Sequence, residues 1–321
     1  MGLRPQSCVP SLSREDRISS PGLPIAEGGG THGTNVWLSA ARAVFTRIRY
    51  SPLGQIEIRI QAPYDKPHRK PTRRIRTERL PIARGDHDPE KIEWLCEVYD
   101  RLFTDRLGWE EGSQFDLAGT DDDNEAALPQ MLGPSGYVPE LLESTYRKNA
   151  AAIARQIFGD GMTDRVGEHM IYKPAGRGAA TPWHQDQAYH DPTLAYKGVN
   201  FWMSLDGATV DSGCLQFVPG SHKMDVLSHH SINHDPRIHG LEVDDPDQWA
   251  DKAVPCPLPV GGATIHACYL LHCAEPNISD RPHRAYTLTF RCELTLRDVP
   301  IDNYWRREQN TARQQRADNH P

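Results

Sequence analysis

Short segments rich in β-branched and aromatic residues restrict the fold of this chain more than any other feature of its sequence. They recur in its second half, and Gly, Pro or Asp residues lie close to their ends. The segments are EHMIYK (168–173), VNFWMSL (199–205), CLQFV (214–218), ATIHAC (263–268) and RAYTLTFRCEL (284–294). Runs of this kind, bounded by turn residues, are typical of strands. The second half of the chain is therefore predicted to form a sandwich or barrel of short strands.

Two helices are predicted before these strands. Asp88 and Pro89 form a helix start signal, with Asp as the N-cap and Pro in the first turn. The apolar residues that follow recur at helical spacing: Ile92, Leu95, Cys96, Tyr99 and Leu102. A second helix is expected from about Pro139 to Phe158. Its apolar face would carry Leu142, Tyr146, Ile153 and Ile157.

The first 85 residues differ from the rest of the chain in composition and residue pattern. Residues 1–35 are rich in Ser, Pro and Gly and are predicted to be disordered. Residues 36–85 form an N-terminal extension in which Ile56, Ile58 and Ile60 alternate with polar residues, as in a half-buried strand. The basic stretch 66–79 is either a solvated linker or a contact for an anion or nucleic acid.

Composition and charge exclude several classes of protein. Apolar residues make up 38% of the chain and no apolar run is long enough to span a bilayer, so no membrane segment is expected. The N-terminus lacks the apolar region of a secretory signal. Seven cysteines without C-x-x-C spacing argue against a disulfide framework or zinc ribbon and favour a reducing cytosol. The net charge of −7 disfavours a general nucleic-acid binder.

The segment ATPWHQDQAYHD (180–191) contains a possible pair of metal ligands. His184 and Asp186 are separated by one residue, so on a strand their side chains would project from the same face. An H-x-D sequence alone is weak evidence, because about one is expected by chance in a chain of this composition. Non-haem Fe(II) oxygenases combine two His and one carboxylate on one face of the metal, which leaves open positions.

Three motifs together resemble the phytanoyl-CoA dioxygenase family of Fe(II)/2-oxoglutarate oxygenases over roughly residues 90–295. They are KPAGRGAATPWHQD, NFWMSLDGATVDSGCLQFVPGSHK and LLHCAEPNISDRPHRA. The resemblance implies a mainly β protein with a double-stranded β-helix, or jelly-roll, core buttressed by the N-terminal helices. The oxygenase domain would cover residues 86–300, with a polar, peripheral C-terminal tail at 301–321.

The resemblance also implies the site and the cofactors. The ligands of Fe(II) would be His184, Asp186 and His272, and Arg284 would bind the far carboxylate of 2-oxoglutarate, since its planar fork matches a carboxylate. Gln185 and Trp202 would lie near this cosubstrate. The implied activity uses O₂ to hydroxylate a small organic molecule or acyl thioester, with release of succinate and CO₂.

Two of these assignments have competitors nearby in the sequence. His266 lies in the strand before His272, and we interpret it as a structural histidine or a neighbour of the metal ligands. Arg281 and Arg291 compete with Arg284 for the carboxylate. We prefer Arg284 because it follows the PHRA pattern and opens a strand.

Several other residues keep two interpretations. Tyr189 and His190 either face substrate or pack in the core, and Trp183 belongs either to the core or to the pocket wall. Lys173 is either a surface lysine or a contact for an anionic group. The His-rich segment from about 223 to 258 is interpreted as a mobile lid over the active site, and as a second metal site only if it is helical.

Two rival functions remain open at this point. One is a nucleic-acid demethylase of the AlkB type, because RAYTLTFR (284–291) superficially resembles its R-x-N-x-T-x-R motif. Against it, arginines seven residues apart fall on opposite faces of a regular strand. The other is a non-catalytic jelly-roll domain that binds a ligand or partner. The presence of all four key residues disfavours this second rival.

Overall fold

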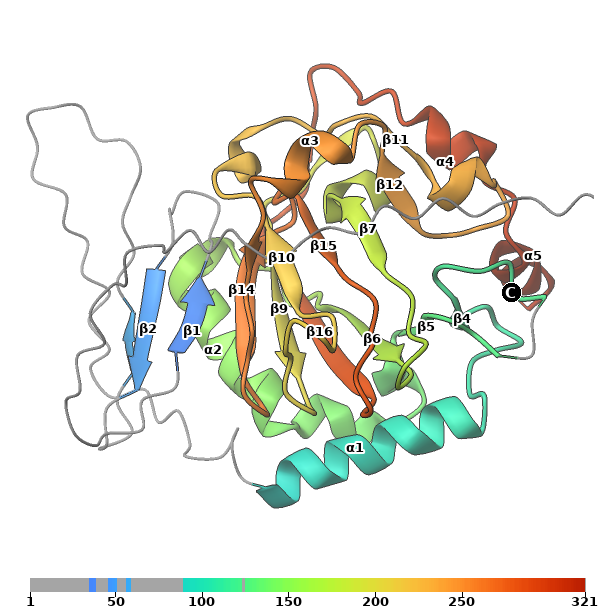
Figure 1. The fold of residues 1–321 in the computed structure, drawn as a ribbon. Helices are drawn as coiled ribbons and strands as arrows, with labels where there is room; N and C mark the ends of the chain where they lie inside the picture. The colour runs from blue at the N-terminus through green and yellow to red at the C-terminus, as the bar shows by residue number, and fades with distance from the viewer. Residues whose placement is uncertain (1–34, 39–45, 51–55, 59–88, 123–124, 321) are drawn as a thin grey trace, which may run out of the picture. The chain divides into compact units, whose positions relative to one another are not determined.

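The computed structural model describes residues 89–122 and 125–320, together with the backbone of β1 (Asn35–Leu38), β2 (Thr46–Tyr50) and β3 (Ile56–Ile58) (Figure 1). The strand expected around Ile56 is confirmed by β3. Apart from Asn35, the disorder expected for residues 1–35 lies outside the described residues, as does the basic stretch 66–79. The proposed domain boundaries stay predictions.

Two mainly antiparallel sheets form the centre of the fold and confirm the predicted jelly-roll class; β1 pairs with β14 in parallel. The large sheet has the order β3-β2-β1-β14-β9-β16-β6-β5-β4, and the small sheet has the order β13-β10-β15-β7. The remaining strands of the large sheet are β4 (Gln114–Asp116), β5 (Pro129–Leu132), β6 (Gly167–Lys173), β9 (Gly198–Ser204), β14 (Ala263–Ala267) and β16 (His283–Arg291). Those of the small sheet are β7 (Thr181–His184), β10 (Leu215–Phe217), β13 (Val254–Pro255) and β15 (His272–Ala274).

Smaller elements connect these strands. Two ribbons pair β11 (His229–Ser231) with β12 (Leu241–Val243), and β8 (Leu194–Ala195) with β17 (Thr295–Leu296). The short 3₁₀ helices are η1 (Pro134–Gly136), η2 (Pro139–Glu143), η3 (Gly159–Gly161), η4 (Asp186–Tyr189), η5 (Ser221–Lys223) and η6 (Ile232–His234). None of the helices in the described part of the chain is long and apolar enough to cross a membrane.

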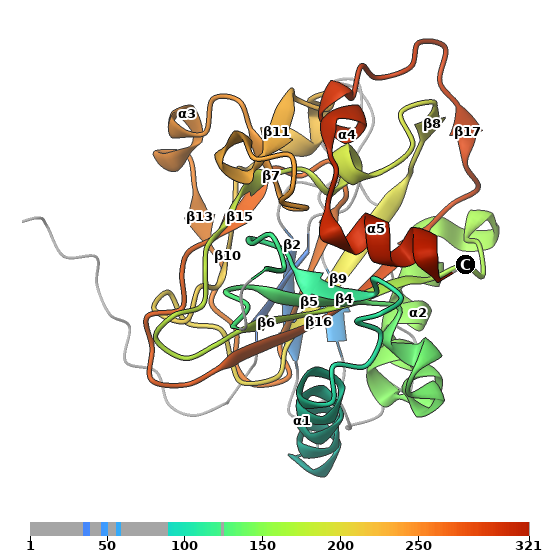
Figure 2. The same cartoon turned by 90° about the vertical axis from the view of Figure 1, so that its right-hand side faces the viewer.

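Helices α1 (Pro89–Thr104) and α2 (Thr145–Phe158) cover the face of the large sheet that points away from the small sheet (Figure 2). The first predicted helix is confirmed. The second is shorter than predicted, because Ser144 ends η2 and caps α2 by accepting a hydrogen bond of 3.3 Å from the Arg147 backbone N–H. Leu142 therefore leaves the predicted apolar face and is 46% exposed.

Residues of β16 alternate between two environments. Tyr286, Leu288 and Phe290 are buried in the core that the sheet shares with α1 and α2. The residues between them face the opposite side of the sheet, toward β7, β10 and β15, as the period of two in a strand requires. The large sheet thus has an apolar outer face and an inner face on which Thr287 and Thr289 are exposed to a cavity.

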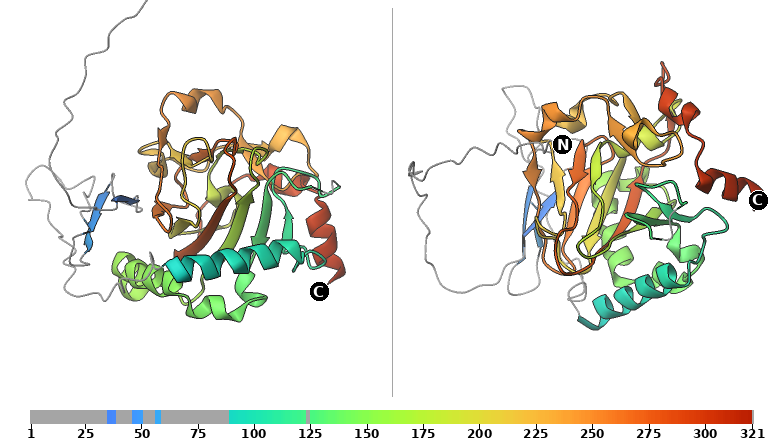
Figure 3. Two further views of the ribbon diagram at one scale, coloured as in Figure 1. Left: turned by 60° about the horizontal axis from the view of Figure 1, so that its bottom comes forward. Right: turned by 45° about the vertical axis from the view of Figure 1, so that its right-hand side comes forward.

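The C-terminal segment is part of the fold rather than a peripheral tail. It forms α4 (Tyr304–Glu308) and α5 (Ala312–Asn319) (Figure 3). Trp305 is 2% exposed, and its indole N–H donates a hydrogen bond of 3.1 Å to the Ala188 carbonyl. The polar composition that suggested a peripheral position reflects the outer faces of these helices. One buried tryptophan is enough to fix α4 against the sandwich.

The expected lid also contains regular structure. It includes β11, β12 and α3 (Asp247–Ala250), and it buries apolar side chains such as Val243 and Trp249. His230 and His234 stack with ring centroids 3.7 Å apart, and His230 also lies 3.0 Å from an Asp244 carboxylate oxygen. His230 lies on β11, and His234 ends η6, where Asn233 and His234 have left-handed backbone angles (φ 58° and 56°). The two histidines therefore do not share a helix, and the condition for a second metal site is not met here. The mobility of this segment stays a prediction.

We expect Leu288→Ala to lower the free energy of unfolding by about 2–5 kcal/mol, because it leaves a cavity in the core between β16 and the helices. Leu288 is 0% exposed, whereas Leu296 on β17 is 80% exposed. The matched control Leu296→Ala should change stability by less than about 0.5 kcal/mol. Denaturant unfolding of both variants measures the difference, and equal effects would contradict the assignment of Leu288 to the core.

Candidate active site

A cavity of about 690 Å³ lies between the inner faces of the two sheets. The large sheet lines it with alternate residues of β6, β9 and β16, among them His169, Asn200 and Thr287. The small sheet contributes residues of β7, β10 and β15. The cavity is therefore the space that the alternation of both sheets leaves between their polar inner faces.

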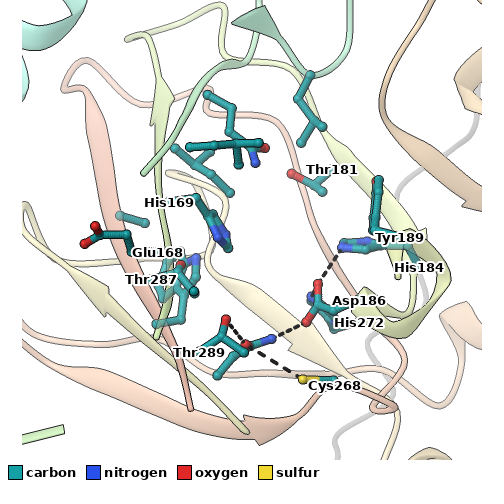
Figure 4. A pocket seen from close by; sticks show the side chains of 18 of the residues that line it. Glu168, His169, Thr181, His184, Asp186, Tyr189, Cys268, His272, Thr287 and Thr289 are labelled. Atoms are coloured by element: carbon teal, nitrogen blue, oxygen red, sulfur yellow. Dashed lines mark hydrogen bonds and ion pairs between the residues drawn. The ribbon is translucent and has the colours of Figure 1, made fainter. Parts of the chain in front are cut away.

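His184, Asp186 and His272 meet at one wall of this cavity (Figure 4). His184 ends β7 and His272 begins β15, and the two residues are direct partners across these antiparallel strands. Asp186 opens η4, two residues beyond His184. One oxygen of Asp186 lies 3.6 Å from Nε2 of His184 and 3.7 Å from Nε2 of His272. Strand pairing thus unites residues separated by 88 positions in the sequence.

Backbone carbonyls fix the tautomer of both histidines. Nδ1 of His184 lies 2.8 Å from the Pro182 carbonyl, and Nδ1 of His272 lies 2.8 Å from the Leu270 carbonyl. Because a carbonyl only accepts hydrogen bonds, each Nδ1 carries the proton and each Nε2 presents its lone pair to the cavity. Burial, followed by the neighbouring His184, lowers the pKa of His272 to about 4, so its imidazole is neutral. Neutral imidazoles held in this way suit metal coordination.

The large sheet orients the carboxylate of Asp186. Asn200 on β9 donates a hydrogen bond to the second oxygen of Asp186, and the Asn200 carbonyl oxygen accepts one of 2.6 Å from Thr289 on β16. Although burial opposes ionisation of Asp186, the adjacent His272 and His184 hold its pKa below its usual value. Two imidazoles and one oriented carboxylate are the donor set of a non-haem Fe(II) site with open positions.

His266 on β14 lies beside this group. Its Nε2 is 3.8 Å from the second oxygen of Asp186, and its Nδ1 is 3.4 Å from the Thr264 hydroxyl. Among the described residues, the close group of possible metal ligands contains His272 and not His266. Burial, followed by the neighbouring His272, lowers the pKa of His266 to about 3. The position supports our interpretation of His266 as a neighbour of the ligands.

Comparison with known proteins identifies the family. Residues 82–285, more than half of the chain, match the family model of phytanoyl-CoA dioxygenase (PhyH). The chain belongs to the phytanoyl-CoA dioxygenase family. It is 28% identical over 188 residues to a phytanoyl-CoA dioxygenase domain-containing protein 1 homolog of Caenorhabditis briggsae, covering 54% of this chain and 64% of the relative. The phytanoyl-CoA dioxygenase domain-containing protein 1 of Bos taurus is 28% identical over 145 residues, which cover 44% of this chain and 50% of the relative. The chain thus spans about half to two thirds of these relatives.

Solved structures support the same relationship. EvdO2 from Micromonospora carbonacea var. aurantiaca is 41% identical with a TM-score of 0.59, over 68% of this chain and 87% of EvdO2. A second structure of EvdO2, complexed with 2-oxoglutarate, has 38% identity and a TM-score of 0.57 over the same shares. The jelly-roll of this PhyH family member is therefore matched in a protein that binds 2-oxoglutarate.

The structure places Arg284, the predicted ligand of the far carboxylate, outside the cavity. Arg284 belongs to the set of β16 residues that face away from the cavity, and it does not line the cavity. Its guanidinium lies 3.5 Å from Asp100 on α1 and 3.7 Å from Asp206. Because the period of a strand sends neighbours to opposite faces, Arg284 and the residue before it point to different sides of the large sheet. His283 lines the cavity instead, whereas Arg291 lines it farther along the strand, as the seven-residue spacing predicts.

Gln185 is also not a cavity residue. It is fully buried, and its side-chain amide bonds to the backbone of three loop residues: Asp225, Leu227 and Tyr269. Its backbone N–H donates a hydrogen bond of 3.2 Å to Nε2 of His229. The predicted contact with the cosubstrate is replaced by a structural one, in which Gln185 ties the loop after η5 to the strand that carries His184.

The remaining candidates divide between cavity and core. Trp202, Tyr189 and His190 line the cavity, whereas Trp183 is buried among apolar residues of the small sheet and the segment that follows it. Lys173 is 3% exposed and lines the cavity, so the surface interpretation is wrong. Our sequence reasoning missed His239, His283, Arg306 and Arg313. His283 could have been found from the sequence, because cavity-facing and core-facing residues alternate along β16.

We expect His184→Ala, Asp186→Ala and His272→Ala each to lower iron binding at least about tenfold, because each removes one of three protein donors. His266→Ala is the matched control, and it should keep most of the iron. Iron per protein chain would be measured after anaerobic reconstitution. Loss of iron in His266→Ala with retention in His272→Ala would show that the distal ligand is His266.

Buried histidines should make the protein sensitive to acid. Burial is the main cause that lowers the pKa of His229 from 6.5 to about 4. Because the folded-state pKa is lower, the unfolded chain binds the proton first, and the contribution of His229 to stability is lost as the pH falls from about 6.5 to 4. The free energy of unfolding should fall by up to about 3 kcal/mol through this residue. In urea titrations the fall should shrink in His229→Gln and persist in the exposed control His320→Gln.

Proposed function

We propose that this protein is an Fe(II)/2-oxoglutarate-dependent dioxygenase that hydroxylates a small organic molecule and releases succinate and CO₂. The convergence of His184, Asp186 and His272 on one cavity wall, with each imidazole held by a backbone carbonyl, carries this proposal. Membership of the PhyH family and the similarity to EvdO2 support it. When bound, iron and 2-oxoglutarate supply the activation of O₂ and the oxidation of a C–H bond.

The proposal assigns each residue a task. His184, Asp186 and His272 would hold the iron through three protein donors, which would leave room at the metal for 2-oxoglutarate and O₂. Asn200 keeps the Asp186 carboxylate in place through its amide N–H. Because a carboxylate occupies the third ligand position, hydroxylation is the expected outcome. An acyl thioester is one candidate substrate class.

Lys173 replaces Arg284 as the residue proposed to receive the far carboxylate of 2-oxoglutarate. Its ammonium donates hydrogen bonds to the carbonyls of Ala274 at 3.2 Å and Glu275 at 2.5 Å, and no carboxylate among the described residues pairs with it. Burial lowers the pKa of Lys173 to about 7. A bound anion would favour its charged form and so be stabilised by it. Gly213 permits this arrangement, because a Cβ there would collide with the Glu275 carbonyl.

His283 lies beside Lys173 and completes the proposed carboxylate site. The two residues are direct partners on β16 and β6. Nδ1 of His283 lies 2.8 Å from the Ser212 carbonyl, and its Nε2 is buried without a hydrogen-bond partner. A buried polar atom without a partner is costly, so it indicates a ligand that the pocket is built to hold.

The position of this pair suits a short dicarboxylate. Ala274 lies two residues beyond His272 on β15, a rise of about 7 Å along a strand. The Lys173 ammonium, which bonds to the Ala274 carbonyl, is therefore close to the metal ligands. The Trp202 ring meets the His283 ring edge-on, with centroids 5.4 Å apart, and forms a wall of the same region.

The rival functions lose support at this site. Arg284 and Arg291 lie on opposite faces of β16, which argues against the arginine pair of an AlkB-type demethylase. A non-catalytic binding domain would have no need for two tautomer-fixed imidazoles around one carboxylate. A reducing cytosol stays the proposed compartment, supported by the six unpaired cysteines in the described part of the chain.

Turnover of 2-oxoglutarate tests the proposed function directly. Succinate would be measured with a panel of small organic molecules and acyl thioesters, while mass spectrometry follows the gain of one oxygen in each. The expected result is iron-dependent succinate formation coupled to oxygenation of at least one class. A protein that binds iron but forms no visible charge-transfer band with 2-oxoglutarate under anaerobic conditions would contradict the proposal.

We expect Lys173→Gln and His283→Phe to weaken 2-oxoglutarate binding roughly ten- to hundredfold, since a hydrogen bond to a charged group contributes about 1.5–3 kcal/mol. Arg284→Gln is the control on the same strand and should leave this affinity within about twofold. Anaerobic titration of the visible band of the iron-loaded protein gives the dissociation constants, and metal analysis confirms that iron is retained. Weaker 2-oxoglutarate binding in Arg284→Gln, with unchanged binding in Lys173→Gln and His283→Phe, would show that Arg284 binds the far carboxylate of 2-oxoglutarate.

A further inference from the structure

Two arginines from the C-terminal helices line the same cavity. Arg306 lies on α4 and Arg313 lies on α5, and both contribute to the cavity wall. These helices follow the end of the PhyH family match at residue 285. The arginines therefore lie outside the residues that the family model matches.

Both arginines lack the acidic partners that their neighbours have. Arg307 lies 2.8 Å from Asp302, and Arg316 lies 2.9 Å from Asp121. Neither Arg306 nor Arg313 forms an ion pair with any residue that the structure describes. Arg306 donates a hydrogen bond of 3.0 Å to the side chain of Gln309. Arg313 lies over the Phe115 ring at 4.9 Å, and its Nε is buried without a hydrogen-bond partner.

Both guanidinium groups belong to half-buried side chains at the cavity wall. Burial lowers the pKa of both, and for Arg313 the charges of Arg306 and Arg316 lower it further. The charges of the two arginines also act on His239. Burial, followed by Arg313 and Arg306, lowers the pKa of His239 to about 3, so its ring is neutral. Its Nδ1 is buried without a hydrogen-bond partner. Like charges held together cost stability, and the acid that favours the charge of Arg313, Asp121, is already paired with Arg316. A bound anion would offset this cost.

Tyr189 and His239 form an aromatic wall of the cavity between these groups and the metal ligands, and Phe115 is buried beside it without lining the cavity. Tyr189 meets the His184 ring edge-on with centroids 6.1 Å apart, and it stacks on His239 at 5.7 Å. Phe115, which lies under Arg313, meets His239 edge-on at 4.9 Å. An organic molecule that contacts this wall would place one end near the metal group and the other near the arginines.

We propose that Arg306, Arg313 and His239 bind an anionic group of the organic substrate, a phosphate or a carboxylate. Guanidinium groups bind both anions through paired, charge-assisted hydrogen bonds. The neutral imidazole of His239 adds one N–H that can donate a hydrogen bond to the anion. The proposal rests on the proposed function for the role of the cavity. It assigns the substrate a charge and leaves Lys173 and His283 to the cosubstrate.

Binding to the metal-free, full-length protein tests the proposal, because the anion site does not use the iron ligands. Two matched pairs of probes would be titrated by tryptophan fluorescence: phenyl phosphate against phenol, and benzoate against benzamide. We expect the charged member of at least one pair to bind about tenfold or more tightly than its neutral partner. The pair that shows the larger ratio distinguishes phosphate from carboxylate.

Variants then assign the effect to the two arginines. Arg306→Gln and Arg313→Gln should each weaken binding of the charged probe about tenfold and leave the neutral probe unchanged. Arg307→Gln, the adjacent and ion-paired arginine on α4, should change neither. Thermal unfolding is the structural readout: neither cavity variant should lower the unfolding temperature in the absence of probe, since each removes an unpaired charge.

Three results would overturn the proposal. Equal binding of charged and neutral probes would remove the evidence for an anion site, and an Arg307→Gln effect equal to that of Arg306→Gln would reduce it to general surface charge. Lower thermal stability of both cavity variants with unchanged probe binding would make the arginines structural. A failure of the proposed dioxygenase activity is separate, because it would appear as a missing 2-oxoglutarate band in the iron-loaded protein.

Discussion

The period of two in strand β16 is the constraint on which the rest of this molecule depends. Tyr286, Leu288 and Phe290 anchor the strand in the core against α1 and α2. This anchoring fixes which residues point the other way, so Thr287 and Thr289 face the cavity. A shift of one residue would exchange the two sets and bury polar groups in the core. Core packing and cavity chemistry are therefore set by the same register.

Register also explains how the candidate metal ligands are brought together. β15 places His272 opposite His184, and carbonyl groups two residues upstream orient both rings. Asp186 is held from the other sheet, through Asn200 and Thr289. Histidines of the small sheet and Asn200 of the large sheet thus lie beside the same carboxylate, that of Asp186. Ligands positioned by strands and by hydrogen bonds lose little freedom on binding an ion, which is the requirement for a precise metal site.

Local patterns predicted the parts of the site that depend on local geometry. The strand segments and the helix from Pro89 concern neighbours in sequence, and the structure contains both. The H-x-D spacing brings His184 and Asp186 together, although Asp186 opens η4 instead of lying on the strand of His184. The position of Arg284 outside the cavity was not foreseen, because it depends on the phase of a strand, which the apolar residues at 286, 288 and 290 would have revealed. The predicted second helix was too long because the Ser144 cap was overlooked.

Other features depend on contacts between distant parts of the chain and carry no local signal. Lys173 is followed by a Pro-Gly turn and looked equally compatible with a surface position, yet it is enclosed by the carbonyls of residues 274 and 275. Trp305 fixes the C-terminal helices through the backbone of Ala188, 117 positions earlier. Such contacts decide which charges reach the cavity, and composition alone gave the opposite impression of a peripheral tail.

The chain has a net charge of −7, yet several cations line its cavity. Acids are plentiful, and several surface arginines are paired with them, yet Lys173, Arg306 and Arg313 are turned inward without an ion-pair partner among the described residues. Placing unpaired cations in a partly buried space costs stability that a surface position would not. Because the fold bears this cost at two places in the cavity, we infer that two negative groups occupy it during function. One is the far carboxylate of 2-oxoglutarate beside Lys173, and the other is the charged end of the substrate beside α4 and α5. The iron ligands in the wall between them would then meet a substrate held at its far end, which leaves its uncharged part to face the open positions of the metal.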